Sequence, residues 1–383
     1  MPLSLYLHIP FCEVKCGYCD FFSVARGYGD FDLQTEYVDQ LIREIEARSE
    51  PYSGRKVHSI FFGGGTPSLL DPKLLERIFS TLRKYFAWDS QTEVTLESNP
   101  KTVSLEKLKS FRSLGVNRLS IGVQSFQDKF LKSLGRIHSG DEAKKTVEEA
   151  RQAGFDRISI DLIFALPGQS FEEWKKDLED GIALGTSHLS AYHLTIESGT
   201  PFASLHRGGK LKLPEEEEGL RMLLWTRERL CQARLEPYEI SNFSRPGFES
   251  VHNQNYWNYG EYLGFGTAAA SFIKEGTARA RRTNVRDLKK YLKGEWEGFS
   301  EEIDLPTAMG EFCMLGLRTR EGIQEGCFAS EFRRSFAETY PQELSFLRER
   351  GWIREEGRGW RLTSDGFLFA DEAAQSFFDP NLR

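Results

Sequence analysis

The sequence lacks two features that would each assign the protein to a broad class. It has no stretch of 18 uninterrupted apolar residues, which argues against a membrane-spanning helix. It has no excess of positive charge either, because 57 aspartates and glutamates outweigh 50 lysines and arginines, for a formal charge of −7. That balance argues against a nucleic-acid surface. Its first residues have no basic region and no long apolar run, so we expect no signal peptide and a cytoplasmic location.

Cysteine is also scarce, and half of it stands in one short stretch. Three of the six cysteines, Cys12, Cys16 and Cys19, have the spacing C-x3-C-x2-C, and the others are scattered. In a reducing compartment, clustered thiols indicate metal binding rather than disulfides. The apolar run 4–9 predicts a strand that leads into the three cysteines. The thiols should therefore lie on one loop at the carboxyl end of a strand.

The number three is informative, because no fourth cysteine lies nearby. Structural zinc and a fully ligated iron–sulfur cluster take four protein ligands. Three thiolates can hold three corners of a cubane and leave the fourth iron open for a small molecule. The pattern therefore favours a [4Fe-4S] cluster. A zinc site completed by a distant residue, or buried structural thiols, are the alternatives.

Apolar strands and amphipathic helices alternate along most of the chain. We expect strands at 4–9, 58–62, 93–97, 118–123, 157–163 and 189–194. The helices should lie at 34–48, 72–85, 105–114, 127–134, 141–153, 171–184 and 214–233. Six such units predict an α/β fold with a parallel sheet and outer helices. Since a full barrel needs eight units, we predict a six-unit, partly open (β/α) barrel, with residues 238–241 as a candidate further strand.

The last part of the chain has a different pattern. Helices are expected at 308–317, 327–340, 342–350 and 366–378, and strands 352–354 and 360–362 flank a hairpin turn. This order resembles a winged helix, but residues 301–383 carry 16 acidic and 10 basic side chains. A DNA-reading wing needs the opposite sign, so we expect a packing or lid domain, with a regulatory DNA-binding module as the weaker alternative. The predicted divisions are 1–245 for the barrel, 246–300 for a connecting region and 301–383 for this domain.

Polar residues follow several of the predicted strands, where a barrel places its active face. The second strand ends in Gly63–Pro67, whose glycines let the backbone approach a ligand. Glu97 and Asp161 suit ribose hydroxyls, and Gln124 can both donate and accept hydrogen bonds. Arg136 suits a carboxylate. Together these residues match a ligand with a sugar, an amine and a carboxylate.

With these stretches the chain resembles the radical S-adenosylmethionine (SAM) superfamily, and within it the oxygen-independent coproporphyrinogen oxidase group, over nearly its whole length. The specific stretches are C-x3-C-x2-C, Gly63–Pro67, Gly122–Phe126 and Asp161–Gly168. The resemblance implies a radical SAM barrel whose three cysteines hold a [4Fe-4S] cluster. It also implies that the cluster's open iron binds SAM and that an electron cleaves it to a 5′-deoxyadenosyl radical. By the same resemblance, the residues that contact SAM are Tyr6, Tyr18, Gly64, Gly65, Thr66, Glu97, Gln124, Arg136 and Asp161.

Two departures separate the chain from the dehydrogenases of that group. Those enzymes have a fourth cysteine two residues after the third, whereas this chain has Phe21 there. They also carry a long extension before the first strand, whereas here the strand is expected to begin at about Ser4. Both differences match the related HemW-type heme chaperones.

The stretch His252–Trp257 points the same way, because it matches the H-N-x-x-Y-W motif of HemW-type proteins. Heme offers a flat apolar face and an iron that accepts an imidazole. Spacing alone favours an aromatic core segment in which His252 is a hydrogen-bonding partner. The resemblance instead implies that His252 binds heme, with aromatic surface from Tyr256, Trp257, Tyr259, Tyr262 and Phe265 nearby.

We therefore predict a heme chaperone that binds a [4Fe-4S] cluster, SAM and heme, and hands heme to heme-requiring acceptor proteins. An electron donor for the cluster is a further expected partner, nucleic acid is not, and a membrane-associated acceptor is compatible with this interpretation. The alternative is an enzyme, a coproporphyrinogen III dehydrogenase that takes hydrogen from propionate side chains and releases carbon dioxide.

Overall fold

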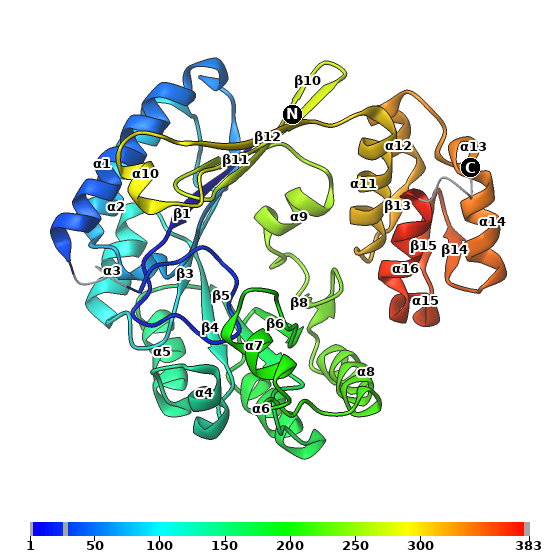
Figure 1. Cartoon of the computed structure of the whole chain (residues 1–383), viewed down its shortest axis with the longest axis horizontal. Coiled ribbons are helices and arrows are strands. Elements are labelled where there is room, and N and C mark those ends of the chain that lie inside the picture. The colour runs from blue at the N-terminus through cyan, green and yellow to red at the C-terminus, as the bar shows by residue number, and fades with distance from the viewer. Residues whose placement is uncertain (1–2, 26–29, 379–383) are drawn as a thin grey trace.

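A sheet of six parallel strands forms the frame of the computed structural model, which describes residues 3–25 and 30–378 (Figure 1). The strands lie side by side in chain order and all run in the same direction. Their bounds are β1 Leu3–Ile9, β2 Val57–Gly64, β3 Glu93–Ser98, β4 Arg118–Gln124, β5 Arg157–Phe164 and β6 His188–His193. The predicted six-unit, partly open barrel is confirmed.

Helices cover the outer face of this sheet (Figure 1). Several begin at a side-chain cap, and the capping boxes of Ser139 with Glu142 and of Ser170 with Glu173 fix the starts of α5 and α6. The bounds are α1 Phe31–Arg48, α2 Pro72–Tyr85, α3 Leu105–Leu114, α4 Asp128–Leu134, α5 Gly140–Gln152, α6 Phe171–Ala183, α7 Pro201–Arg207 and α8 Glu216–Gln232. Helix α7 is an additional element that the sequence pattern does not predict.

Alternation along β1 decides which side chains face the site. Leu3, Leu5 and Leu7 are fully buried and belong to the main core beneath the helices. Because successive side chains of a strand point to opposite faces, Tyr6 and His8 face the inside of the barrel. The same period of two places polar residues of the neighbouring strands on that inner face.

The sheet continues beyond β1 and β6, which the sequence analysis did not anticipate. Strand β9 (Tyr262–Phe265) pairs parallel with β1, and β10 (Ala270–Glu275), β11 (Ala278–Asn284) and β12 (Glu297–Glu302) follow antiparallel. On the other edge lie β8 (Asn242–Ser244) and β7 (Glu236–Pro237), so the expected strand at 238–241 is wrong and falls in the turn between them. Strands β7, β8 and β9 are short, whereas β11 and β12 are rich in charge and partly or largely exposed, and apolar patterning therefore missed them.

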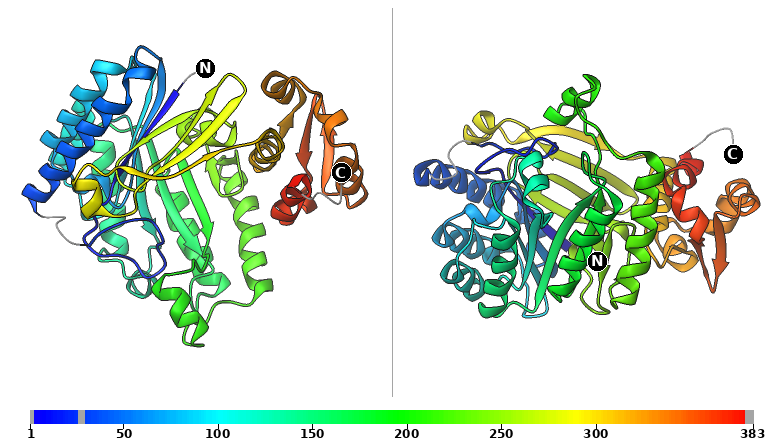
Figure 2. Two further views of the ribbon diagram at one scale, coloured as in Figure 1. Left: turned by 45° about the horizontal axis from the view of Figure 1, so that its top comes forward. Right: turned by 90° about the horizontal axis from the view of Figure 1, so that it is seen from below.

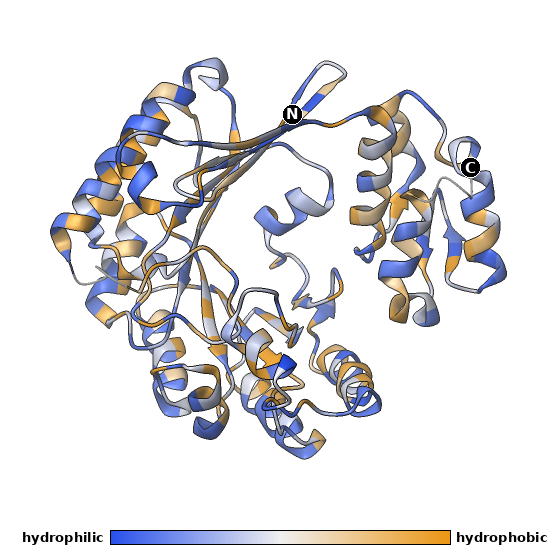
Figure 3. Cartoon of the chain, in the orientation of Figure 1, coloured by the Kyte–Doolittle hydropathy of each residue, from blue (hydrophilic) through white to orange (hydrophobic). Residues whose placement is uncertain are grey.

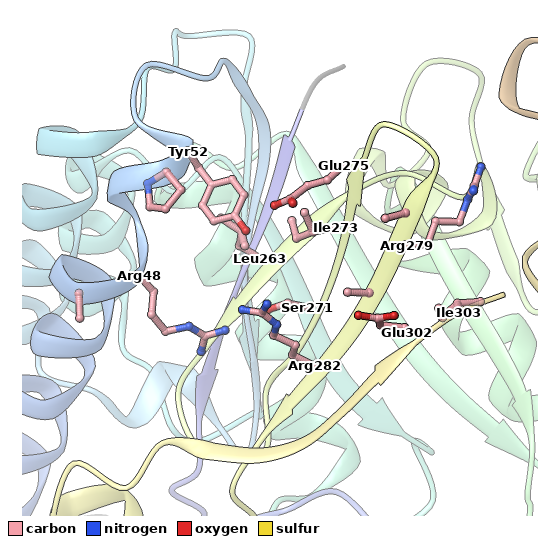
Figure 4. A pocket seen from close by; sticks show the side chains of 14 residues that line it. Arg48, Tyr52, Leu263, Ser271, Ile273, Glu275, Arg279, Arg282, Glu302 and Ile303 are labelled. Carbon is pink, nitrogen blue, oxygen red and sulfur yellow. The ribbon is translucent and has the colours of Figure 1, made fainter.

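The outer face of β9–β11 is only partly covered by helices, and a groove of about 450 Å³ lies there beside the end of α1. Figure 4 shows the guanidinium groups of Arg48 and Arg282 pointing toward one another in this groove. Arg48 is already paired with Glu44, and Glu275 and Glu302 also line the groove. The groove therefore has cations and carboxylates in comparable number and shows no preference for one sign of ligand.

The C-terminal domain has its own core, in which Phe312, Phe328, Phe332 and Phe336 pack together. A three-stranded sheet in the order β13-β15-β14 packs beside its helices, which confirms a helical domain with a hairpin. The bounds are α11 Leu305–Leu317, β13 Ile323–Gln324, α12 Glu325–Phe332, α13 Phe336–Thr339, α14 Pro341–Glu349, β14 Ile353–Glu356, β15 Gly359–Leu362, α15 Ser364–Leu368 and α16 Ala370–Gln375.

Two of the expected C-terminal helices are interrupted. The helix expected at 327–340 is divided after Arg333, whose φ of 58° ends α12 in the left-handed conformation. The helix expected at 366–378 is divided at Phe369. Figures 1 and 2 show this domain beside α8 and the far end of the extended sheet. Figure 3 shows hydrophilic residues along each helix, and within the described residues no helix is long and apolar enough to cross a membrane.

A buried carboxylate fastens the sheet extension to α1. Glu44 is fully buried, and its Oε1 accepts hydrogen bonds from Arg48 Nη1 and Asn284 Nδ2, both at 2.6 Å. Its Oε2 accepts from the Gly266 backbone N–H and the Tyr291 hydroxyl, both at 2.8 Å. One side chain therefore joins α1, the turn after β9, the end of β11 and helix α10 (Leu288–Leu292).

Replacing this carboxylate should destabilise the fold. Glu44→Ala removes an acceptor that four donors share, and we expect a loss of about 3 kcal/mol in the free energy of unfolding. Urea denaturation of the two proteins measures it. The control is Glu46→Ala, which removes only an exposed pair with Lys84 and should change stability by less than about 0.5 kcal/mol. Equal losses in the two variants would contradict the role of Glu44.

Candidate functional site

A cavity of about 460 Å³ opens at the carboxyl ends of the parallel strands. Most of the residues predicted from the sequence line it, although they come from five different strand–loop junctions. These are Cys12, Cys16, Cys19, Tyr18, Gly64, Gly65, Thr66, Glu97, Gln124, Arg136 and Asp161. Tyr6 and His252 are not among the lining residues and lie deeper in the barrel.

The cysteine loop is held by one internal backbone contact and by backbone contacts with two other segments. The Cys12 N–H donates to the Val24 carbonyl at 3.0 Å, which closes the loop on itself. The Gly17 N–H donates to the Leu134 carbonyl at the end of α4, at 3.2 Å, and the Gly17 carbonyl accepts from Phe202 of α7 at 2.9 Å. A Cβ at position 17 would stand 2.7 Å from the Phe202 ring, so the loop passes close against α7.

The glycines after β2 allow another close approach. The Gly65 N–H donates to the Ile9 carbonyl at 2.8 Å, and the Thr66 N–H donates to the Phe11 carbonyl at 2.7 Å. A Cβ at position 65 would lie 2.6 Å from that Phe11 oxygen, and backbone cannot move aside as a side chain can. Gly64 has a φ of 111°, and a Cβ at this position would lie 2.5 Å from the His8 ring. The turn is therefore built to hold the start of the cysteine loop.

A chain of hydrogen bonds connects two of the cysteines across the cavity. Arg136 Nη1 lies 3.7 Å from Cys16 Sγ, and its Nη2 donates to Asn99 Oδ1 at 2.6 Å. Asn99 Nδ2 donates to Thr66 Oγ1 at 2.9 Å, and the Thr66 hydroxyl lies 3.6 Å from Cys12 Sγ. Asn99 is not among the site residues predicted from the sequence, although its position directly after β3 is a signal that could have identified it.

Two carboxylates face each other on the inner side of the sheet. Glu97 Oε2 accepts from the Gly64 N–H at 3.2 Å, and Asp161 Oδ2 accepts from the Ser120 hydroxyl at 3.2 Å. Burial, reinforced by the charge of Asp161, raises the pKa of Glu97 to about 8. Burial also raises the pKa of Asp161. Such a pair is well placed to accept hydrogen bonds from a ligand with hydroxyl or amine groups.

Gln124 stands at an irregularity of β4. Its φ of 69° lies in the left-handed region, and the pairing register with β5 shifts between Gly122 and Gln124. A non-glycine residue in this conformation carries about 1 kcal/mol of strain. Ser120, Gly122 and Gln124 all line the cavity, as the strand period of two expects, so Gln124 keeps this face despite the register shift.

The thiol set fits a cubane cluster better than a single ion. All three cysteines line one cavity, yet within the described ranges no group of three or more His, Cys, Asp or Glu side chains could hold one metal ion. A cubane instead binds each thiolate at a different iron. Burial raises the pKa of the Cys12 thiol, and that of Cys19 to about 11, so thiolates form here only with a strong positive charge nearby. The alternative of a zinc ion finds no support in this arrangement.

His252 lies apart from the cavity, with both ring nitrogens engaged. It belongs to α9 (Val251–Trp257) and is 1% exposed. Its Nδ1 lies 2.9 Å from the Ser59 hydroxyl, its Nε2 lies 2.9 Å from the Tyr256 hydroxyl, and its ring stacks on Phe61 at 4.9 Å. Burial lowers the pKa of His252 to about 3, so the imidazole is neutral at pH 7.

Tyr6 stands between His252 and the cysteine loop. Its ring centroid is 6.5 Å from that of His252, and its hydroxyl lies 3.1 Å from His8 Nδ1. His8 Nε2 in turn lies 2.8 Å from the Phe22 carbonyl, directly after the cysteines. The two predicted sites are therefore separate, but neighbouring side chains connect them.

The raised pKa of Glu97 predicts a pH-dependent difference in stability. In the unfolded chain this carboxyl ionises near its ordinary pKa of 4.5, whereas in the folded chain it ionises near 8. The folded state therefore loses stability relative to the unfolded state as the pH rises between these values. Because Gln does not titrate, Glu97→Gln should be more stable than the parent at pH 8, on the order of 2 kcal/mol, and similar to it at pH 5.

Urea denaturation midpoints of the parent and of Glu97→Gln, both without cluster or SAM, measure this stability difference at pH 5, 6.5 and 8. Glu46→Gln, at an exposed position, serves as the control and should follow the parent at each pH. A difference between Glu97→Gln and the parent that does not change with pH would contradict the assigned burial and coupling.

Comparison with known proteins places the chain among related sequences. The sequence pattern of the radical SAM superfamily matches residues 6–181, and that of the HemN C-terminal domain matches residues 303–369. The chain is 34% identical over 379 residues to the heme chaperone HemW of Lactococcus lactis, covering 98% of this chain and 97% of that protein. It is 35% identical over 384 residues to the heme chaperone HemW of Haemophilus influenzae, covering 98% of each.

A solved structure resembles the whole chain. It is coproporphyrinogen III oxidase (HemN) from Escherichia coli, described as a radical SAM enzyme. The TM-score is 0.84 at 26% identity, and the match covers 98% of this chain and 90% of that one. Fold, cavity and full-length similarity agree, and the chain belongs to the HemW family of heme chaperones within the radical SAM superfamily.

Proposed function

We propose that this protein binds heme, a [4Fe-4S] cluster and SAM, and delivers heme to heme-requiring acceptor proteins. Support comes from the cavity in which the three thiols lie together with a set of polar side chains that we call the polar ring: Glu97, Gln124, Arg136 and Asp161. Further support comes from the relatives named heme chaperone HemW. Cys12, Cys16 and Cys19 would hold the cluster. When bound, such a cluster supplies an electron and an iron site open to an amine and a carboxylate.

The polar ring would position SAM. Glu97 and Asp161 can accept hydrogen bonds from its ribose hydroxyls or amine, and Gly64 and Gly65 line the same cavity. Arg136 Nη2 already donates to Asn99 Oδ1 and to the Gly122 carbonyl, so the guanidinium is fixed in orientation before any ligand arrives. A carboxylate would then meet a preorganised cation.

Phe21 supports a carrier over a dehydrogenase. It lines the cavity and is 65% exposed, at the place where the dehydrogenases of the coproporphyrinogen oxidase group have a fourth cysteine. A phenyl ring offers an apolar face and no metal ligand. An exposed aromatic at the mouth of a polar cavity suits contact with an apolar ligand or a partner surface.

The proposed binding of heme iron by His252 requires a rearrangement. An axial bond to Nε2 must replace its hydrogen bond with Tyr256, and the ring must gain access from a position that is 1% exposed. The low pKa of His252 favours the bond, because iron takes the neutral imidazole. Tyr256 therefore competes with iron for the same nitrogen.

This competition gives a prediction for two variants. In an anaerobic heme titration followed at the Soret band, His252→Ala should lose the ligand-dependent shift of the parent. Tyr256→Phe should bind heme more tightly, by about 3- to 10-fold, because removing one hydrogen bond worth about 1 kcal/mol frees Nε2. Tyr262→Phe, a neighbouring ring that does not hydrogen-bond His252, is the control. Unchanged binding in His252→Ala would remove His252 from the site.

The rival function is coproporphyrinogen III dehydrogenase, which the full-length similarity to HemN favours. An anaerobic assay with reconstituted cluster, SAM, a reductant and coproporphyrinogen III tests it directly. We expect no protoporphyrinogen above the background of a Cys16→Ala variant. Formation at many turnovers per protein would replace the chaperone proposal by the enzymatic one.

A further inference from the structure

A second cavity, of about 310 Å³, lies where the C-terminal domain meets the barrel. Its lining comes from α8 and β7 on one side and from the end of α11, β14, β15 and α15 on the other. Figures 1 and 2 show α8 beside this end of the domain. The junction is bonded through backbone, because the Arg320 N–H donates to the Tyr238 carbonyl at 3.0 Å.

The charges of this cavity have predominantly one sign. Its lining includes one carboxylate, Glu239, and several guanidinium groups: Arg227, Arg318, Arg320, Arg354 and Arg361. We call it the arginine cleft. Glu239 is already engaged, since its Oε1 accepts from the Ser241 N–H and from Asn242 Nδ2. A cationic cleft stands out on a domain whose sequence is acidic overall.

The ion pairs of these arginines are weak, and the pair of Arg320 with its exposed neighbour Glu321, at 3.2 Å, is one of them. Arg318 reaches Asp371 at 3.7 Å, but that carboxylate is 89% exposed. Arg354 and Arg361 share one carboxylate, Glu356, at 2.9 and 3.0 Å. Exposed pairs of this kind contribute little, so folding alone does not account for five guanidinium groups around one cavity.

The guanidinium group of Arg227 is a second, independent indication that the cleft binds an anionic ligand. It makes no hydrogen bond or ion pair among the described residues, and its Nη1 is buried without a partner. Its guanidinium lies 3.6 Å from the Phe367 ring centre, which fixes its position across the domain junction. Burial lowers the pKa of Arg227, which reflects a charge that its surroundings compensate poorly. A buried donor without an acceptor is costly unless a ligand supplies one.

The cleft also adjoins the predicted heme motif. Arg318 lies over the ring of Trp257, the last residue of that motif, at 5.1 Å, and the Arg318 Nε is likewise buried without a partner. Apolar side chains complete the lining: Leu224, Leu317, Leu362 and Phe367. A ligand with two carboxylate or phosphate groups on an apolar body would pair with the guanidinium groups and pack against the apolar side chains.

We propose that the arginine cleft binds the carboxylate edge of a porphyrin, with its propionate groups held by Arg227, Arg354 and Arg361. This inference rests on the proposed function, because heme is the ligand it places here. A cavity of this size takes one edge of the macrocycle rather than the whole of it. Phosphate groups are oxyanions as well and could bind the same arginines. The experiment below distinguishes porphyrin carboxylates from phosphate groups.

The test uses metal-free protoporphyrin IX, which cannot bind an imidazole through iron. Titration into the full chain, followed by tryptophan quenching, should show binding to the parent. Arg354→Gln with Arg361→Gln should bind about tenfold more weakly, because two charge-assisted contacts are lost. The dimethyl ester of the porphyrin, which has no carboxylates, should bind both proteins equally. Salt should weaken porphyrin binding to the parent more than to the variant.

Two controls isolate the cleft. Arg334→Gln with Arg358→Gln removes the same charge from the same domain at exposed positions that make no side-chain bond among the described residues, and it should bind like the parent. His252→Ala should keep its affinity for the metal-free porphyrin. Thermal melts of each variant without ligand, matching the parent, verify folding.

Several outcomes would overturn the inference. If the parent and the cleft variant bind protoporphyrin equally and heme binding is intact, the cleft does not bind porphyrin, whereas the proposed function is not contradicted. If inorganic phosphate or ATP raises the melting temperature of the parent but not of the cleft variant, and porphyrin binding is alike in both, the cleft is a phosphate site. A parent that binds neither heme nor porphyrin contradicts the inference and the proposed function together.

Discussion

The contact between two backbone segments at the carboxyl edge of the sheet determines most of this structure's chemistry. The turn after β2 donates two hydrogen bonds, from Gly65 and Thr66, to the carbonyls of Ile9 and Phe11, where the cysteine loop begins. Only glycine at position 65 permits this close approach, because any Cβ there would collide with the Phe11 carbonyl oxygen. Because both segments emerge from adjacent parallel strands, the sheet itself fixes the loop that carries the thiols.

The remaining site residues are arranged relative to that contact. Thr66 both ends the turn and faces Cys12 Sγ, and through Asn99 it leads to Arg136 and Cys16. A shift of the turn would therefore move the polar ring and the thiols together. Preorganisation of this kind reduces the reorganisation needed when a charged ligand binds.

Sequence reasoning located this site because it lies on regular elements. Residues near the carboxyl ends of neighbouring parallel strands, such as Glu97 of β3 and Gln124 of β4, lie at one edge of the sheet, so the spacing of strands in the sequence already predicted that they lie together. Patterning failed for β9–β12, where side chains such as Arg281 alternate with partly exposed apolar ones and pair with Glu301 and Glu311 of later segments. Those strands depend on long-range contacts, which no local pattern contains.

His252 and the arginine cleft illustrate the same limit. The motif His252–Trp257 is visible in the sequence, but its burial is not, since Ser59 and Phe61 of β2 provide it from far along the chain. Similarly, Arg227 of α8 stands far from the other arginines of the cleft in the sequence and meets them only because the C-terminal domain packs against α8. Neither arrangement follows from spacing, because each depends on how two separately folded surfaces meet.

Helix α9 is the element through which these two regions can affect each other. At its start, the carboxylate of buried Glu93 accepts from the N–H groups of Val251 and His252. At its end, the ring of Trp257 lies under Arg318 of the C-terminal domain. The helix is only seven residues long, so a displacement of the helix as a rigid unit changes the surroundings of His252 and the contact of Trp257 together. The predicted heme motif and the C-terminal domain are therefore in contact through one short helix.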